Sequence, residues 1–284
     1  MIEKRLVIAS LVVIAASGAS AQTAYAPIPP LPLGGSLLTL QAPHIPAEGT
    51  WEIKFTHRFN QAVDQGSGST RVHSLFGLDS NADVVFGASW SPRRDLEISL
   101  MRSNALDDIE TAVKYVIVEQ AKSIPLSVAV RAGGDWRTEA NLGDRSSVFG
   151  QLILSRQFGR RFEIFALPTY ATNAGRVATA TSSGALFKHA ENVPAGAALM
   201  VGHALSLVAE FVPRNRDLPK GTKADYGWAF GVKRAIGGHS FEILVTNSNG
   251  TTVDQYVTTT YQGGMLKKGD VHLGFNIERR FGKR

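Results

Sequence analysis

Cysteine is absent from the 284 residues of this chain. The protein therefore has no disulfide bond, no thiol chemistry and no cysteine ligand for a metal ion or a haem. Exported proteins often rely on disulfide bonds for stability. Without them, a chain of this length must be held together by backbone pairing and side-chain packing alone.

A long apolar run is also absent. A membrane-spanning helix needs about 20 consecutive apolar residues, whereas the mean hydropathy of the chain is −0.03. The nearest candidate is the uncharged stretch 192–209, which Pro194 and Gly196 interrupt. Its Gly202-His203 pair fits a tight turn, so we expect two strands there rather than a helix.

No tract of the sequence carries charge of one sign alone. Lysine and arginine number 30 against 24 acidic residues, which gives a formal net charge of +6, and the two signs are mixed along the chain. Nucleic-acid binding gathers basic residues into a patch or stripe. We therefore do not infer it from the pI of about 9.6.

The N-terminus has the layout of a secretory signal peptide. A short basic region and an apolar run over residues 6–16 precede Ala19-Ser20-Ala21, whose small side chains suit a cleavage site. The alternative is a membrane anchor, but the apolar run is too short to span a bilayer. We expect residues 1–21 to be a signal peptide and the mature chain to begin at Gln22.

A proline-rich stretch follows the signal peptide. Residues 26–35, APIPPLPLGG, contain four prolines and end in two glycines. Such a sequence fits neither a helix nor a central strand. We expect residues 22–48 to form an extended linker and residues 49–284 to form the folded domain.

The folded domain shows period-two alternation of apolar and polar residues, which is typical of β-strands. In the first segment, Trp51 and Ile53 lie on one face, and Glu52 and Lys54 lie on the other. Twelve segments follow this pattern: 50–58, 83–91, 95–103, 109–119, 126–134, 147–157, 161–170, 196–201, 206–212, 226–234, 239–247 and 271–281.

The connections between these segments alternate in length, except that the links after the third and fourth segments are both about six residues long. Short links follow the second, sixth, eighth and tenth segments, and long links follow the first, fifth, seventh, ninth and eleventh. The long links cover roughly 59–82, 135–146, 171–195, 213–225 and 248–270. Outer-membrane barrels have short periplasmic turns and long outer loops. The sequence therefore predicts an all-β fold, a closed antiparallel up-and-down transmembrane β-barrel of about 12 strands in the outer membrane.

The less apolar face of the strands carries charges of both signs. Its members are Glu52, Lys54, Arg131, Glu210, Lys233 and Glu242. Lysine or arginine facing the lipid midplane costs about 2–4 kcal/mol, so we expect these six residues to line the lumen. The alternative is a soluble periplasmic barrel whose apolar faces point inward around an apolar ligand, because periodicity alone does not tell the two faces apart.

Short motifs along the chain resemble a known family. They are His57-Arg58-Phe59, Leu75-Phe76-Gly77-Leu78-Asp79-Ser80, Gly237-Gly238-His239 leading into Phe241, Thr246-Asn247-Ser248, and Gly274-Phe275-Asn276-Ile277 with Phe281. In this order and spacing they resemble a bacterial domain-of-unknown-function family of membrane-bound β-barrel proteins, over about residues 38–281. The resemblance implies a barrel and a membrane, and it brings no established activity with it.

Motifs that carry chemistry are missing. The sequence has no nucleotide-binding, zinc-protease or calcium-loop signature, so we expect no catalytic residue, no cofactor and no metal ion. His239-Ser240 does not form a nucleophile–base pair, because adjacent residues of a strand point to opposite faces. Residues at the predicted strand ends and in a loop are candidates for rim or ligand contacts: His57, Arg58, Asp79, His239 and Asn247.

The sequence leaves the function open between several classes. Barrels of about eight strands are filled by side chains, and those of sixteen to eighteen hold an aqueous channel. With twelve strands we expect a filled or narrow lumen, hence a non-enzymatic narrow channel or a structural or docking protein. Its expected partners are outer-membrane lipid and a small polar solute, with no nucleic acid. The alternative is an outer-membrane enzyme that modifies lipid.

Overall fold

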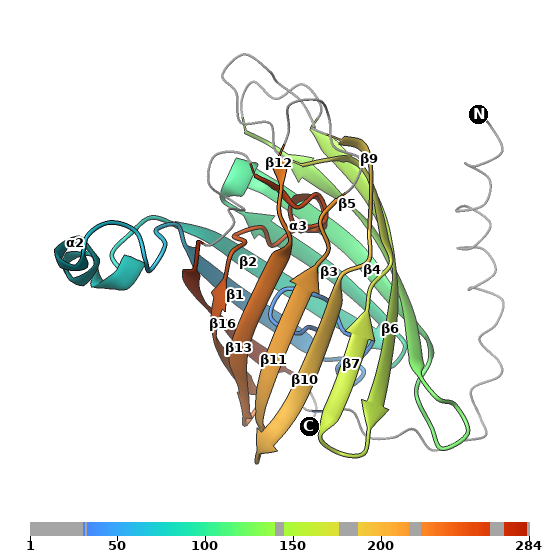
Figure 1. Ribbon diagram of the computed structural model, residues 1–284. Coiled ribbons are helices and arrows are strands. Elements are labelled where there is room, and N and C mark those ends of the chain that lie inside the picture. Colours follow the sequence, from blue (N-terminus) through green and yellow to red (C-terminus); the bar gives the residue numbers. More distant parts are fainter. Residues whose placement is uncertain are drawn as a thin grey trace.

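The computed structural model describes residues 31, 33–139, 145–175, 187–215, 223–261 and 270–282. The expected signal peptide and the first residues of the expected linker lie outside the described residues. Figure 1 shows one barrel whose strands cross at a tilt to its axis.

Twelve strand positions close the barrel, and the strand at each position pairs antiparallel with its two neighbours. The first and last strands are hydrogen-bonded to each other, with Trp51 opposite Phe281 and Arg58 opposite Gly274. The strands of the ring are β1 (Trp51–Phe59), β2 (Ala82–Arg93), β3 (Leu96–Ser103), β4 (Asp108–Val118), β5 (Ser127–Arg137), β6 (Ser146–Phe158), β7 (Phe162–Ala166), β10 (Ala195–Gly202), β11 (Leu205–Val212), β13 (Gly227–Ile236), β14 (His239–Thr246) and β16 (His272–Phe281). The predicted fold class and strand number are confirmed, and the stretch 192–209 forms strands rather than a membrane helix.

At two of these positions the strand is interrupted by a proline, which has no backbone N–H to donate to the neighbouring strand. β7 resumes after Pro168 as β8 (Thr169–Ala174), and β9 (Phe187–Asn192) precedes Pro194 and β10. The carbonyl groups at the breaks still pair, since Leu152 N donates to Pro168 O and Leu167 N donates to Pro194 O. β9 corrects the sequence prediction, which placed residues 171–195 in a loop. Polar residues dominate β9, and its alternation is too weak to reveal a strand.

The two ends of the barrel differ. At the first, here called the turn end, strands join through the short links 94–95, 119–126, 159–161, 203–204 and 237–238. Gly237 and Gly238 have φ values of +55° and +87°, as the two central residues of a type I′ hairpin turn require. Strands β1 and β16 also begin and end there, so the described chain enters and leaves the barrel at this end.

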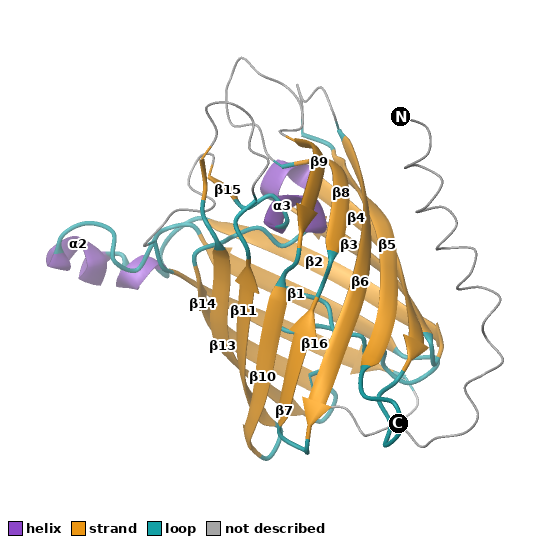
Figure 2. Cartoon of the chain, turned by 45° about the vertical axis from the view of Figure 1, so that its right-hand side comes forward, coloured by secondary structure: helices purple, strands orange, loops and turns teal. Residues whose placement is uncertain are grey.

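The opposite end, here called the loop end, carries the longer connections. They hold α2 (Gly68–His73), η1 (Leu75–Gly77), η2 (Ala105–Asp107), the small sheet of β12 (Lys223–Ala224) and β15 (Thr260–Tyr261), and α3 (Val253–Tyr256). α2 projects to the side of the barrel, whereas α3 lies at its mouth (Figure 2). No helix in the described part of the chain has the length and apolar character to span a membrane. The predicted alternation of link length is interrupted around β4 and β5, because the loop-end links 104–107 and 138–145 are no longer than the turn-end link 119–126.

The polarity of the wall is inverted relative to a soluble protein. Large apolar side chains point outward, and Phe86 and Ile243 are 62% and 72% exposed. On β1, the outward Trp51 alternates with the buried Glu52, and the same strand buries Arg58. The outer surface is thus suited to lipid and the lumen holds the charges. The alternative of a soluble barrel with inward apolar faces is wrong.

A charge on the outer face of the barrel should therefore destabilise it. Ile243 lies near the middle of β14, and we expect Ile243→Lys to lower the free energy of unfolding in lipid vesicles by about 2–4 kcal/mol, because the ammonium group would face the lipid midplane. Val72→Lys on α2 is the matched control, since Val72 is 62% exposed outside the barrel wall, and its unfolding free energy should stay unchanged. Equal unfolding free energies for the two variants would contradict a lipid-facing Ile243.

Candidate functional site: the plugged lumen

Residues 33–46, here called the plug, lie inside the barrel (Figure 1, blue). The backbone reaches them from the turn end, where Gly49 N donates to Ser91 O at 2.7 Å. Leu33, Leu37 and Leu40 are at most 1% exposed. The linker that the proline content predicted is thus, over residues 33–46, a segment inside the lumen. Its leucines explain the difference, because they bury apolar surface that a solvated linker would leave in water.

The plug leucines fit against glycines of the wall. A Cβ atom at Gly196 would lie 2.4 Å from Leu37 Cδ1, and one at Gly231 would lie 3.1 Å from Leu38 Cδ2. The leucines join one buried apolar cluster with wall residues such as Phe165. Gly196 and Gly231 on the inner face therefore make room for the plug.

Glu210 holds the plug by its backbone. One carboxylate oxygen, Oε1, accepts hydrogen bonds from the N–H groups of Leu38, Thr39 and Leu40 at 2.8, 2.8 and 2.9 Å. Successive N–H groups that converge in this way form an anion-binding concavity. Hydrogen bonds to a charged acceptor are about twice as strong as neutral ones, so Glu210 is a principal anchor of the plug.

Two wall lysines bind plug carbonyl groups. Lys233 Nζ donates to Ser36 O at 2.9 Å and to Leu37 O at 3.3 Å, and it is ion-paired with Glu242 and Glu278 of the wall. Lys114 Nζ donates to Gly35 O and lies 3.1 Å from Glu97. Asn276 Nδ2 adds a bond to Leu38 O at 2.8 Å. Each lysine thus joins a carboxylate of the wall to the backbone of the plug.

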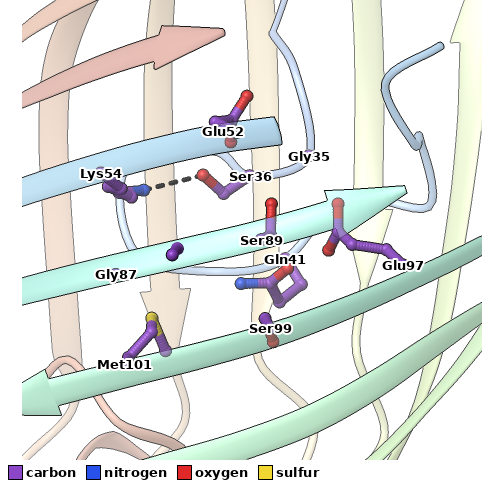
Figure 3. A pocket seen from close by; sticks show the side chains of 11 residues that line it. Gly35, Ser36, Gln41, Glu52, Lys54, Gly87, Ser89, Glu97, Ser99 and Met101 are labelled. Carbon is purple, nitrogen blue, oxygen red and sulfur yellow. Dashed lines mark hydrogen bonds between the residues drawn. The ribbon is translucent and has the colours of Figure 1, made fainter. Parts of the chain in front are cut away.

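A small polar cavity remains between the plug and strands β1 to β3. Figure 3 shows Lys54 reaching Ser36 of the plug, with Glu52 and Glu97 nearby. Lys54 Nζ donates to Ser36 Oγ at 2.7 Å and lies 3.1 Å from Glu278 Oε1. The cavity volume of about 40 Å³ is room for a few water molecules and for no larger solute.

The structure places all six predicted lumen residues on the inner face. Glu52 is ion-paired with Arg280 at 2.6 Å, and Arg131 is paired with Glu110 and donates to Gln151 Oε1 at 3.0 Å. The other four lie around the plug. Sequence reasoning missed further inner residues of the same kind: Glu97, Glu110, Lys114, Glu163, Asn276 and Glu278. Their signal was available, since they occupy the same alternation register as the predicted six.

The five predicted rim residues do not form one site. His57 lies on the outer face, stacked on Phe275 with ring centroids 5.0 Å apart, whereas Arg58 is buried inside and donates to Asn276 Oδ1. Asp79 is exposed in the link between β1 and β2. His239 lies at the turn end, hydrogen-bonded to Arg279. Asn247 lies at the loop end, where its side chain accepts from Trp228 N and donates to Tyr226 O.

The segment around α3 closes the lumen at the loop end. Val253, Tyr256 and Val257 are at most 4% exposed, and Gln151 Nε2 donates to Tyr256 Oη at 2.7 Å. Burial raises the pKa of the Tyr256 hydroxyl, so this group stays neutral. Beside it, Asp108, Asp135 and Asp254 form the one group of metal-ligating side chains found among the described residues.

Comparisons with known proteins agree with this architecture. A protein family described as "Membrane bound beta barrel domain (DUF5777)" matches residues 34–281. The chain is similar in fold to the NanC porin, with 9% sequence identity and a TM-score of 0.50 over 82% of this chain and 100% of that one. An outer membrane channel from Pseudomonas putida F1 has 10% identity and a TM-score of 0.48, over 84% and 97% of the two chains.

The outer membrane phospholipase A from Escherichia coli is also similar, with 11% identity and a TM-score of 0.41 over 86% of this chain and 95% of that one. No curated protein sequence matches the chain. At these identities the likeness to solved structures concerns the fold alone.

The role of Glu210 as an anchor of the plug is open to test by labelling. The chain has no cysteine, so Leu37→Cys introduces a single thiol that reacts with a maleimide only when the plug leaves the lumen. Adding Glu210→Ala removes three charge-assisted hydrogen bonds, and we expect the labelling rate to rise roughly tenfold or more.

Gln65→Cys, on the exposed link between β1 and β2, is the matched control and should react equally fast with and without Glu210→Ala. Heat-dependent migration on gels verifies that each barrel is folded. An unchanged labelling rate at position 37 in the folded double variant would show that Glu210 does not retain the plug.

Proposed function

Because the chain belongs to the membrane-bound β-barrel domain family (DUF5777), we propose that it is a non-enzymatic outer-membrane channel for a small polar solute, closed by its own plug. The proposal rests mainly on how the wall charges are paired. Lys233 pairs with Glu242 and Glu278, and Lys114 pairs with Glu97. These pairs join wall to wall, so they stay complete when the plug is withdrawn.

The plug itself suits removal. Residues 33–43 carry no charge, and the wall holds them mostly through backbone groups. Withdrawal would therefore leave Lys114 and Lys233 paired with wall carboxylates, while Glu210 would lose its three backbone donors. Such a lining suits a solute that both donates and accepts hydrogen bonds, rather than an ion of one sign.

A sealed structural or docking barrel is the second candidate, and α3 favours it. The buried residues 252–258 close the loop end as the plug closes the turn end. In that case the two segments would be permanent fillers of a barrel whose wall side chains do not fill it.

We place the protein in the outer membrane and propose that residues 1–21 are removed on export, so that the mature chain begins at Gln22. The short turns then face the periplasm and the long connections face the exterior, as in other barrels of this kind. The plug enters the lumen from the periplasmic side in this orientation.

Conductance across a planar lipid bilayer tests the channel. We expect the full chain to show at most rare opening steps, and a variant that lacks both residues 33–46 and residues 252–258 to give regular steps above the lipid background, because the wall pairs remain and both closures are gone. A deletion of the exposed residues 64–70 is the matched control, and it should behave like the full chain.

Two single deletions separate the closures: one lacks residues 33–46 and the other lacks residues 252–258. Steps in only one of them would show that the segment it lacks closes the channel by itself. A folded barrel that conducts in none of these three deletion variants would overturn the channel and leave the sealed structural barrel.

The positions of His57 and His239 support the proposed lack of enzymatic activity. His57 and His239 are near opposite ends of the barrel, His57 packs on Phe275, and Ser240 is buried on the inner face away from His239. We expect His57→Ala and His239→Ala to leave the outer-membrane lipid composition, measured by mass spectrometry, equal to that of wild type. A lipid species that accumulates in either variant and in a gene deletion would establish the lipid-modifying alternative.

A further inference from the structure

Three carboxylates from three separate elements meet at the loop end of the lumen. Asp108 is the first residue of β4, Asp135 lies near the end of β5, and Asp254 belongs to α3. One ligand oxygen of each lies within 4.8 Å of the others. The three side chains are 0%, 2% and 0% exposed, so water does not screen their mutual repulsion.

The hydrogen bonding of this cluster is incomplete. Asp108 Oδ1 and both carboxylate oxygens of Asp135 have no hydrogen-bond partner within the described part of the chain. The charged groups that Asp135 faces are the carboxylates of Asp254, Glu110 and Asp108. Taking an unpaired carboxylate out of water costs several kcal/mol, and buried polar groups in folded proteins are almost always satisfied. The two oxygens of Asp135 therefore point to a missing positive partner.

The local charges give the size of the deficit. Four carboxylates lie together here, those of Asp108, Glu110, Asp135 and Asp254. Two guanidinium groups face them: Arg131 is paired with Glu110, and Arg137 Nε lies 3.0 Å from Asp254 Oδ2. Within the described ranges of the chain, two negative charges of this group remain uncompensated, which is the charge that one divalent cation supplies.

The donor set indicates which cation. The available ligand atoms are carboxylate oxygens, together with the hydroxyl of Thr252, whose Oγ1 lies 2.9 Å from Asp108 Oδ2 and 2.7 Å from Asp254 Oδ1. Oxygen ligands suit hard cations. A buried site that supplies several protein oxygens in irregular geometry suits Ca²⁺ better than Mg²⁺, which keeps most of its water.

We propose that Asp108, Asp135 and Asp254 bind one Ca²⁺ ion that ties α3 to the barrel wall. Asp254 is the only one of the three that is outside a strand of the wall. The ion therefore bridges the loop-end closure to β4 and β5, and its removal loosens that closure while the wall stays paired. The site contains no residue of the plug.

Calcium titration of the folded full-length chain in detergent, after treatment with EDTA, tests the proposal. We expect one Ca²⁺ per chain by titration calorimetry and a higher unfolding temperature when Ca²⁺ is bound. Asp135→Asn keeps the shape of the side chain and removes its charge, so Ca²⁺ binding should weaken roughly tenfold or more. Asp79→Asn, an exposed carboxylate of another loop-end link, is the matched control and should bind as wild type does.

The unfolding temperature in EDTA distinguishes a lost ligand from a damaged fold. Without the ion, Asp135→Asn should be at least as stable as wild type, because it relieves repulsion among the carboxylates. If Asp135→Asn does not fold, Asp108→Asn takes its place. The proposal is overturned if folded wild type binds no Ca²⁺ or if the Asn variants bind it unchanged.

Discussion

Contact with lipid is the constraint on which the rest of this structure depends. Lipid offers no partner to a charged group or to an unpaired backbone N–H, so the sheet must close on itself and its outer face must be apolar. The lumen is then the place where charged side chains are stable, and there they must be paired. Wall pairs such as Lys114 with Glu97, and Lys233 with Glu242, follow directly from this constraint.

A ring of twelve strands is too wide for its wall side chains to fill and too narrow for the open channel of the largest barrels. The chain occupies the remaining space with its own segments. Apolar volume comes from leucines such as Leu37, which fits where Gly196 leaves room, and polar contact comes from backbone groups that bind Glu210 and Lys233. The plug therefore satisfies buried wall groups and adds almost no charge of its own.

Much of the wall was predictable from the sequence, because apolar and polar residues alternate along each strand as its side chains face lipid and lumen in turn. The same reading identified Glu210 and Lys233 as inner residues but not what they bind, since backbone N–H and carbonyl groups leave no trace in residue identity. The plug was missed because its prolines and glycines suggest a linker and its few leucines show no period.

The acidic cluster was missed for a different reason. Asp108, Asp135 and Asp254 are far apart in the sequence and fit no short motif, and only the pairing of β4 with β5 brings the first two to the same end of the barrel. Each is an ordinary polar residue at a strand end or in a loop until the register is known. Periodicity finds faces of strands, whereas a site built across strands needs their order and offset.

The two closures of the lumen differ in chemistry, and this difference separates what can open them. The plug is neutral along most of its length and binds through backbone hydrogen bonds, so its release depends on competition for Glu210 and the wall lysines, or on a pull from the turn end. α3 is held near a group of carboxylates whose charges two arginines only partly offset. If the proposed Ca²⁺ ion binds there, the position of α3 depends on cations at the loop end, whereas the contacts of the plug do not. A barrel closed in these two ways opens throughout its length only when both conditions are met, which is a stricter requirement than either segment alone imposes.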